Sequence, residues 1–180
     1  MKLKSLLLFL LLSLFGLILV ACNNDDTTSE TEENSDKVDV KQLVNDYSTD
    51  KKKAESASIT GEELVVNTTA GKEKSYELPK DEFFVSIAPF VEQTHPCTYH
   101  SLTGCQGEMV KKEFDVYIED EDGNVVVDEK VMSLANGFID LWVPRDKKYH
   151  ITIEHDGKQV QSEFSSYTED PTCLTNMQLT

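Results

Sequence analysis

Short alternating runs of apolar and polar residues recur along the last hundred residues, and this pattern predicts a mainly β protein. One buried and one solvent-facing strand face produce such a period of two. Hairpin turn signals such as Asp122-Gly123 and Asn136-Gly137 separate several of the runs. Six segments have the character of strands: 83–88, 114–119, 125–131, 138–143, 149–153 and 160–164. We therefore expect residues 81–180 to form an antiparallel β-sandwich domain with immunoglobulin-like dimensions.

Residues 38–80 have a different pattern and are expected to form a small α+β unit ahead of the sandwich. The apolar positions within 38–47 recur at helical spacing, which predicts a short amphipathic helix. Two or three short strands are expected between residues 57 and 78, with a turn at Ala70-Gly71.

The first residues have the pattern of an export signal. Lys2 and Lys4 precede an apolar run over residues 6–20, and the sequence Leu19-Val20-Ala21-Cys22 then resembles a bacterial lipobox. An uncleaved membrane anchor is the alternative, but a spanning helix needs about 20 apolar residues. We expect residues 1–21 to be a signal peptide and Cys22 to carry a lipid that anchors the protein at the outer face of the membrane.

The charge of the chain changes the choice of partners. Residues 22–37 are polar and acidic and should form a disordered tether. Of the 17 basic residues two lysines precede Cys22, so 15 remain against 33 acidic residues, a net charge of −18. Binding to nucleic acid needs a basic surface, and this balance argues against it. The negative net charge fits a soluble domain that is held away from an anionic envelope.

Candidate chemistry is concentrated in the loop over residues 94–108. This loop contains Cys97 and Cys105, with His95 and His100 beside them. The remaining cysteine of the mature domain, Cys173, lies in the C-terminal tail.

Three cysteines remain when Cys22 is lipidated, and an odd number in an exported protein suggests a free thiol, an intermolecular bond or a metal site. A Cys97–Cys105 disulfide would close a loop of about nine residues and contribute about 2.6 kcal/mol on the chain-entropy model. A Cys105–Cys173 bond would close about 69 residues and contribute about 4.4 kcal/mol. Neither bond explains the third thiol or the two histidines. A disulfide-stabilised surface or adhesion module without metal nevertheless stays open beside a metal site.

The ligand types limit the metal. Thiolates with imidazole select Cu(I) or zinc over magnesium, calcium or manganese. Structural zinc sites usually take four ligands at short paired spacings, and the seven residues between Cys97 and Cys105 match that poorly. Cu(I) accepts two or three soft ligands, and thiols can also reduce Cu(II) as they oxidise. The pattern favours copper over zinc.

Several uncommon strings occur in order between residues 83 and 180: FVSIAPF at 84–90, THPC at 94–97, GCQGE at 104–108, ANGFIDLWVPRD at 135–146 and PTCLTNMQL at 171–179. They resemble the CueP family of extracytoplasmic copper-binding proteins. The resemblance implies copper binding in the bacterial envelope, with Cys97, Cys105 and Cys173 as the functional set. It also implies reduction of Cu(II) and delivery of copper to an envelope enzyme. A lipidated Cys22 departs from the periplasmic members of the family and leaves the identity of the copper-accepting protein open.

We therefore predict a copper-binding envelope lipoprotein of copper tolerance that sequesters copper and reduces Cu(II) through its thiols. Beside the three cysteines, His100 is the first candidate for a nitrogen ligand and His95 the second. A shared site requires Cys173 to return to the loop of Cys97 and Cys105. No other catalytic motif stands out. Among the remaining acids, Glu108 is expected as a solvated carboxylate, or else as a group that orients a histidine, and Asp140 is expected to face solvent.

Overall fold

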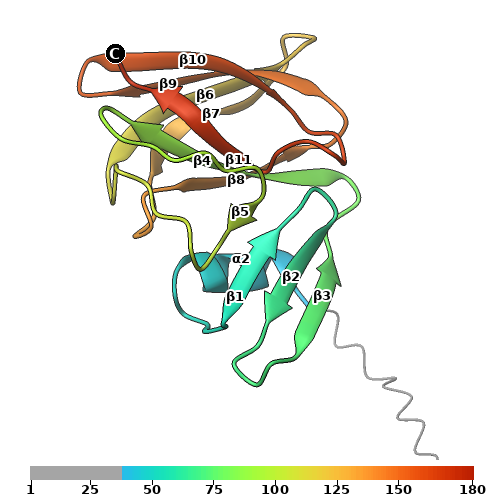
Figure 1. The fold of residues 1–180 in the computed structure, drawn as a ribbon. Coiled ribbons are helices and arrows are strands. Elements are labelled where there is room, and N and C mark those ends of the chain that lie inside the picture. Colours follow the sequence, from blue (N-terminus) through green and yellow to red (C-terminus); the bar gives the residue numbers. More distant parts are fainter. Residues whose placement is uncertain (1–37) are drawn as a thin grey trace, which may run out of the picture. The chain divides into compact units, whose positions relative to one another are not determined.

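Strands dominate residues 38–180, the part of the chain that the computed structural model describes (Figure 1). The predictions for the signal peptide, the lipid on Cys22 and the acidic tether lie outside these residues. Residues 38–180 belong to one compact unit, and the division expected at residue 80 remains a prediction. Within residues 38–180, no helix is long and apolar enough to cross a membrane. The elements are α2 (Val40–Ser48), β1 (Ser56–Ile59), β2 (Glu63–Asn67), β3 (Glu73–Glu77), β4 (Glu82–Phe90), β5 (His100–Ser101), β6 (Glu113–Asp120), β7 (Val125–Met132), β8 (Ile139–Pro144), β9 (Lys148–His155), β10 (Lys158–Ser165) and β11 (Cys173–Gln178).

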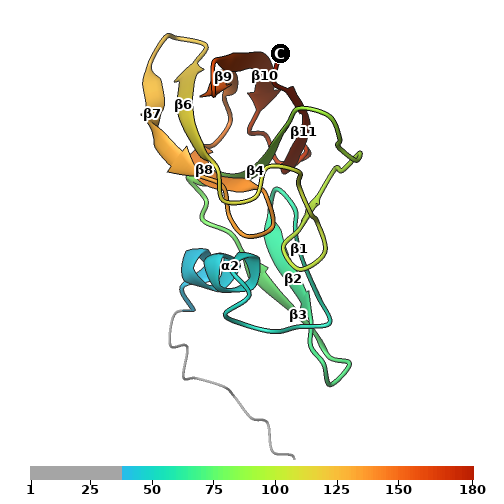
Figure 2. The ribbon, with the colours of Figure 1, turned by 90° about the vertical axis from the view of Figure 1, so that its left-hand side faces the viewer.

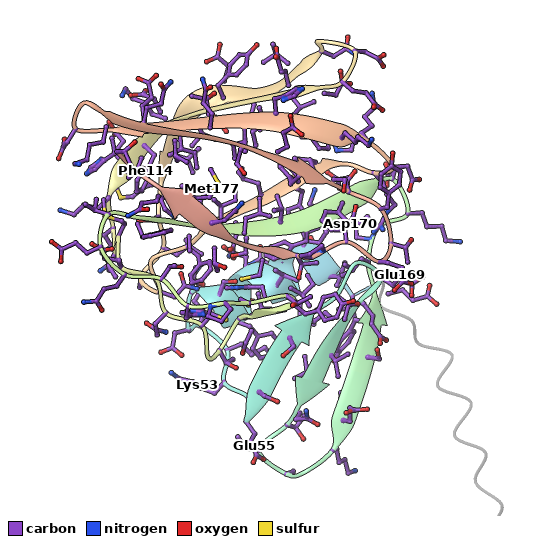
Figure 3. All side chains as sticks on the ribbon, turned by 45° about the horizontal axis from the view of Figure 1, so that its top comes forward. Lys53, Glu55, Phe114, Glu169, Asp170 and Met177 are labelled. Carbon is purple, nitrogen blue, oxygen red and sulfur yellow. The ribbon has the colours of Figure 1, made fainter. Side chains whose placement is uncertain are left out.

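Two sheets pack face to face and confirm the predicted sandwich. One has the strand order β10-β9-β6-β7 and the other the order β11-β4-β8. Apolar side chains from both sheets meet between them, and Phe114 of β6 and Met177 of β11 belong to this layer (Figure 3). The buried members of this sandwich core are Phe83, Val85, Ile87, Met109, Phe114, Val116, Ile118, Ile139, Val143, Tyr149, Ile151, Ile153, Phe164, Met177 and Leu179.

From Phe83 onward strand β4 is buried on both faces, which explains why its sequence is mostly apolar rather than alternating. Phe83, Val85 and Ile87 point into the sandwich core. On the opposite face, Phe84 belongs to a second core, and Ala88 packs with Phe138 and Cys173 in a third cluster. The β11-β4-β8 sheet is therefore a middle layer with apolar contacts on each side.

The second core lies between the middle sheet and the N-terminal elements. The Asp39 carboxylate accepts a hydrogen bond from the Gln42 N–H (3.0 Å) and caps α2. Leu43, Val44 and Tyr47 form the buried side of α2, which lies beside the β3-β2-β1-β5 sheet (Figure 2). They pack with the other buried members of this core: Ala57, Ile59, Leu64, Val66, Leu78, Phe84 and Leu102. The predicted helix and hairpin strands are present at close to the expected residues.

Two strands were not predicted from the sequence, and each contains a candidate site residue, His100 in β5 and Cys173 in β11. β5 is two residues long and pairs with β1 in the register Ile59↔His100. β11 runs parallel to β4, with Cys173 opposite Ser86, and is an exception to the expected antiparallel pairing. Its register shifts before the Met177↔Pro89 pair. Proline has no N–H for a regular ladder, which fits an irregularity at this point.

Asp140 is half-buried and hydrogen-bonded within the protein, rather than facing solvent freely as expected. One of its carboxylate oxygens accepts a hydrogen bond from the Ser48 hydroxyl and the other from the Ser86 hydroxyl, each 2.6 Å long. Asp140 thus joins the end of α2 to the middle sheet. The prediction was wrong because its position in β8, between apolar neighbours, says nothing about the helix that packs over that face.

Asp120 organises the β6–β7 turn and supplies a pH-dependent part of the stability. Its carboxylate accepts hydrogen bonds from the N–H groups of Asp122 (3.0 Å) and Asn124 (2.9 Å) and from the Lys147 ammonium. The Lys147 bond, followed by those of Asn124, holds the pKa of Asp120 well below its ordinary value of 3.8. A depressed carboxyl pKa stabilises the folded state at pH values above about 4, and this contribution is lost as the pH falls through the folded-state pKa.

We therefore expect Asp120→Asn to lower the free energy of unfolding at pH 7 and to have a shrinking effect below about pH 4. Urea unfolding at pH 7 and pH 3 measures the difference. Asp128→Asn, which changes an exposed carboxylate on the neighbouring strand β7, is the control. An Asp120→Asn deficit of equal size at both pH values would contradict the ionic role.

Candidate metal centre

Three thiols and one imidazole come together on the side of the middle sheet that faces away from the sandwich core. One ligand atom from each of Cys97, His100, Cys105 and Cys173 lies within 4.8 Å of all the others. The Cys97 and Cys105 sulfur atoms are 3.7 Å apart, and the Cys173 sulfur is 3.7 Å from His100 Nδ1. We call these four residues the thiol cluster. The tail cysteine has returned to the loop, as a shared site required.

Strand pairing places the buried half of the cluster. Cys173 lies opposite Ser86 of β4, and its backbone N–H donates to the Thr98 carbonyl (3.2 Å). It therefore faces away from the sandwich core and toward the 94–108 loop. His100 lies opposite Ile59, so the N-terminal sheet holds the imidazole.

A contact between two glycines positions the loop that carries Cys105. The Gly107 N–H donates to the Asn136 carbonyl (2.6 Å), which brings the loop against the turn before β8. Gly137 has φ +83°, a conformation that side chains disfavour. A Cβ added to Gly137 would lie 2.4 Å from the Gly107 carbonyl oxygen, so glycine is required here twice over.

The cluster has a buried side and an accessible side. His100 is fully buried against Phe138, with ring centroids 4.5 Å apart, and Cys173 is 3% exposed. Within the described residues, His100 Nε2 has no hydrogen-bond partner. Cys97 and Cys105 are only half-buried. A metal ion or an oxidant therefore reaches the cluster from the side of Cys97 and Cys105.

The three thiols differ in how readily they lose a proton. The neighbouring Cys173 thiol, followed by His100, favours the charged form of Cys105 and lowers its pKa well below the ordinary value. The neighbouring Cys105, together with burial, raises the pKa of Cys173. Burial raises the pKa of Cys97. Cys105 is therefore the thiol of the three that loses its proton most readily, and thiolates are both the nucleophile and the soft metal ligand.

The family model described as "Periplasmic copper-binding protein CueP" matches residues 39–178. The chain belongs to the CueP family. A solved protein titled "Crystal Structure of S.CueP" is 35% identical to it, with a TM-score of 0.73 over 78% of this chain and 88% of that chain. No curated protein matches. The match spans the helix, the N-terminal sheet and the sandwich, so CueP membership covers every segment that contributes to the thiol cluster.

His95, the second nitrogen candidate, lies near the cluster but outside the four residues that meet there. Its ring centroid is 6.3 Å from that of Phe138, and its Nδ1 lies 3.4 Å from the Pro96 carbonyl oxygen. A ligand role for His95 remains a prediction. The other two histidines, His150 and His155, lie on β9, away from the CueP-family cysteines.

Glu108 has a positioning role that sequence reasoning missed. Its side chain is exposed, as expected, but one carboxylate oxygen accepts hydrogen bonds from the N–H groups of Val91 (3.0 Å), Glu92 (2.9 Å) and Gln93 (2.9 Å). These bonds, that of Gln93 first, lower the pKa of Glu108. The carboxylate thus fixes the main chain just after β4 and does not orient a histidine. Three consecutive donors form an anion-binding concavity that only tertiary structure creates.

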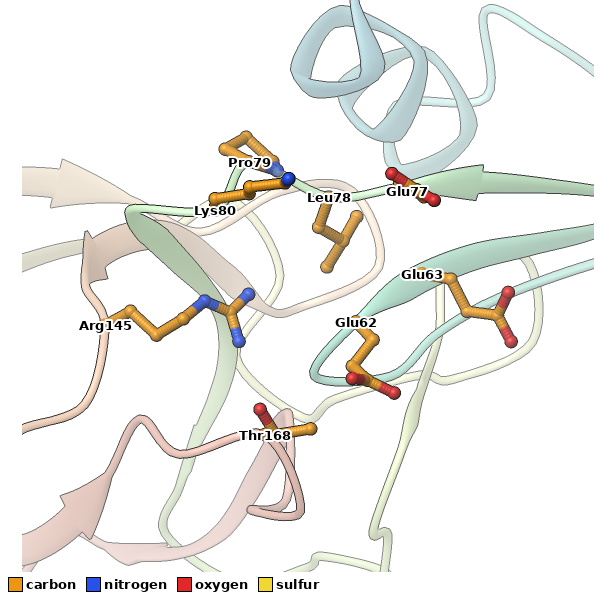
Figure 4. Close-up of a pocket in the computed structure, with 8 residues that line it drawn as sticks. All are labelled: Glu62, Glu63, Glu77, Leu78, Pro79, Lys80, Arg145 and Thr168. Atoms are coloured by element: carbon orange, nitrogen blue, oxygen red, sulfur yellow. The ribbon is translucent and has the colours of Figure 1, made fainter.

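A separate hollow of about 490 Å³ carries charge but no thiol or imidazole (Figure 4). Carboxylates lie opposite the Arg145 guanidinium, which donates a hydrogen bond to the Glu82 carbonyl (2.9 Å). Its lining consists of Glu62, Glu63, Glu77, Leu78, Pro79, Lys80, Arg145 and Thr168. The side chains that a soft metal ion prefers, thiols and imidazole, are therefore found in the thiol cluster and not in the lining of this hollow.

Proposed function

We propose that this protein binds one Cu(I) ion through Cys97, Cys105 and Cys173 with His100 as the nitrogen ligand. The observation that carries the proposal is the convergence of three thiols and one imidazole within 4.8 Å, three of these groups from the 94–108 segment and the fourth from the C-terminal strand β11. Membership in a periplasmic copper-binding family supports copper as the ion.

The spacing of the four ligand atoms suits a single metal ion that all four residues bind together. Metal–thiolate bonds are about 2.3 Å long, so two ligands of one tetrahedral ion are about 3.8 Å apart. The Cys97–Cys105 and Cys173–His100 separations are both 3.7 Å. Only small side-chain movements would then be needed to bring all four atoms onto one ion. A site that forms before the ion arrives loses little ordering entropy on binding.

Three thiolates and an imidazole are also a known ligand set for structural zinc. Cu(I) is the softer ion and prefers thiolates more strongly. The half-buried Cys97 and Cys105 leave one side of the cluster accessible, which suits an ion that must be loaded and released. Family membership and this accessibility together favour copper over zinc.

The second half of the proposal is reduction of Cu(II). Two thiols give one electron each to two Cu(II) ions, form one disulfide bond and release two protons, leaving two Cu(I) ions. The thiolate character of Cys105 supports this reaction because thiolates, not thiols, react first. One Cu(I) should appear for each thiol that is consumed.

The deciding experiment is a titration of the reduced protein with Cu(I) in competition with a colorimetric Cu(I) chelator, repeated in the presence of zinc. We expect one Cu(I) bound per chain and no displacement by equimolar zinc. Free thiols counted in protein purified without reductant show whether the alternative, a disulfide-stabilised module without metal, describes the native state. Failure to compete with the chelator would exclude the copper-binding role.

We also propose that the protein is a lipoprotein of the cell envelope, which places the thiol cluster outside the cytoplasm. The support is the sequence alone: the basic start, the apolar run and the Leu19-Val20-Ala21-Cys22 string. Two or more acyl chains on Cys22 would anchor stably, whereas a single chain would not.

We expect Cys22→Ala to move the protein from the membrane fraction to the soluble fraction or to leave an uncleaved precursor, because the acyl acceptor is missing. Fractionation, together with mass spectrometry of the mature N-terminus, measures this. Cys97→Ala, which changes a cysteine of the thiol cluster, is the matched control and should stay in the membrane fraction. A wild-type N-terminus that begins elsewhere and carries no lipid would rule out the anchor.

A further inference from the structure

Thr172 joins three segments that are far apart in the sequence. Its side chain is fully buried, directly before Cys173. Its hydroxyl donates a hydrogen bond to the Ile59 carbonyl (2.7 Å) and accepts one from the His100 N–H (3.0 Å). One hydroxyl group thus connects β1, β5 and the start of β11.

The main chain of Thr172 is fixed independently of its hydroxyl. The Thr172 carbonyl accepts a hydrogen bond from the Ser86 N–H (2.9 Å), which attaches this residue to β4 in the middle sheet. The hydroxyl therefore extends from an immobile support toward β5. Strand β5 itself has only two residue pairs with β1, so its own ladder holds it weakly.

We propose that Thr172 is a positioning residue, whose hydroxyl sets the location of His100 relative to Cys173 and thereby completes the nitrogen side of the copper site. This inference rests on the proposed Cu(I) function of the thiol cluster. The hydroxyl satisfies both neighbouring backbone groups because it acts as donor and acceptor at once. An apolar side chain of the same shape could do neither.

Without the hydroxyl, the His100 N–H would lose its buried acceptor and the Ile59 carbonyl its buried donor. Buried polar groups left unpaired are unfavourable, so β5 would shift toward solvent to satisfy them. Such a shift moves the imidazole, since His100 carries both the lost N–H and the proposed ligand. Changes in groups that orient metal ligands typically lower metal affinity about 10- to 100-fold.

The test compares Thr172→Val, which keeps the shape, with Thr172→Ser, which keeps the hydroxyl. Chelator competition should show Cu(I) binding weakened about tenfold or more in Thr172→Val and close to wild type in Thr172→Ser. Ser166→Ala is the matched control, because it removes a fully buried hydroxyl bonded to the Pro144 carbonyl, remote from the cluster. If Thr172→Val does not fold, Thr172→Ala replaces it, since alanine and serine differ only by the hydroxyl.

Two further readouts separate positioning from general destabilisation. In a His100→Ala background, Thr172→Val should cause no additional loss of Cu(I) affinity, because the residue through which it acts is gone. In the metal-free protein, amide hydrogen exchange at His100 should become faster in Thr172→Val and stay slow in Thr172→Ser.

The outcomes distinguish the two proposals. An undiminished affinity in Thr172→Val, or an equal loss in the His100→Ala background, would overturn the positioning role. If the wild-type protein bound no Cu(I), the proposed function would fail, but amide exchange at His100 in the metal-free protein would still test the hydrogen bond from the His100 N–H to the Thr172 hydroxyl. Faster exchange in Thr172→Val supports the positioning of His100 by this bond, and unchanged exchange overturns it.

Discussion

Replacing Cys105 by serine is expected to weaken Cu(I) binding about 100-fold or more and to abolish most of the reduction of Cu(II). Structural zinc sites with four ligands bind with about 10–16 kcal/mol, so one thiolate contributes roughly 3 kcal/mol, equivalent to about 100-fold. Cys105 should exceed this share because its lowered pKa makes it the thiol that is most readily available as a thiolate ligand. Chelator competition and a colorimetric Cu(I) assay after addition of Cu(II) measure the two effects.

The companion variants rank the remaining ligands. His100→Ala should weaken binding less than Cys105→Ser, because it removes one neutral ligand among stronger thiolates. A variant lacking Cys97, Cys105 and Cys173 together should bind no Cu(I). If it bound as the wild type does, the thiol cluster would not be the copper site. Loss of binding with persistent reduction would refute only the redox half of the proposal.

Replacing Gly137 by alanine is expected to destabilise the protein by about 2 kcal/mol or more and to weaken Cu(I) binding as well. The left-handed conformation alone is unfavourable for alanine by about 1 kcal/mol. The added Cβ would also lie 2.4 Å from the Gly107 carbonyl oxygen, so the Cys105 loop must move. Thermal unfolding should show a midpoint at least about 4 °C lower, and chelator titration reports the site.

Gly123→Ala provides the matched control for this variant. Gly123 has a similar φ of +79°, but no atom lies within 4 Å of the position that its Cβ would take. It should therefore show the conformational penalty alone and leave Cu(I) affinity unchanged. Equal effects of the two substitutions on copper binding would mean that the glycine contact does not position Cys105.

Elements with a local signal could be predicted from the sequence. The helix near residue 40 has its apolar stripe, and the β6–β7 and β9–β10 hairpins have alternating strands around Asp-Gly turns. β4 was recognised as an apolar strand, although it extends past the proline at which it was expected to end. In these cases the residue pattern that identifies the element lies within the element itself and its adjoining turn.

Elements held by distant partners could not be predicted. β5 has two residues, too few for any periodicity, and exists because β1 lies beside it. β11 has an irregular pattern and a register shift, and its pairing with β4 joins residues almost ninety positions apart. Predicting β5 requires knowing where β1 lies, and predicting β11 requires knowing where β4 lies.

The ligand types of the candidate site could be predicted from the sequence, but the residues that position those ligands could not. Three cysteines and neighbouring histidines indicated a soft metal, and the family resemblance indicated copper. Thr172 and Glu108 gave no such signal, because an isolated threonine or glutamate has no characteristic spacing. Their roles come from backbone groups of other segments, which the sequence does not place.

The two buried faces of β4 make the α2 layer and the sandwich interdependent. A shortened chain beginning near residue 81 would expose Phe84 and its neighbours, because their covering residues belong to α2, β1 and β2. The uncovered segment FFVSIA at 83–88 is uncharged and, apart from Ser86, apolar, and such strands associate readily with one another. The small N-terminal layer therefore shields an aggregation-prone strand, in addition to holding the imidazole of the thiol cluster.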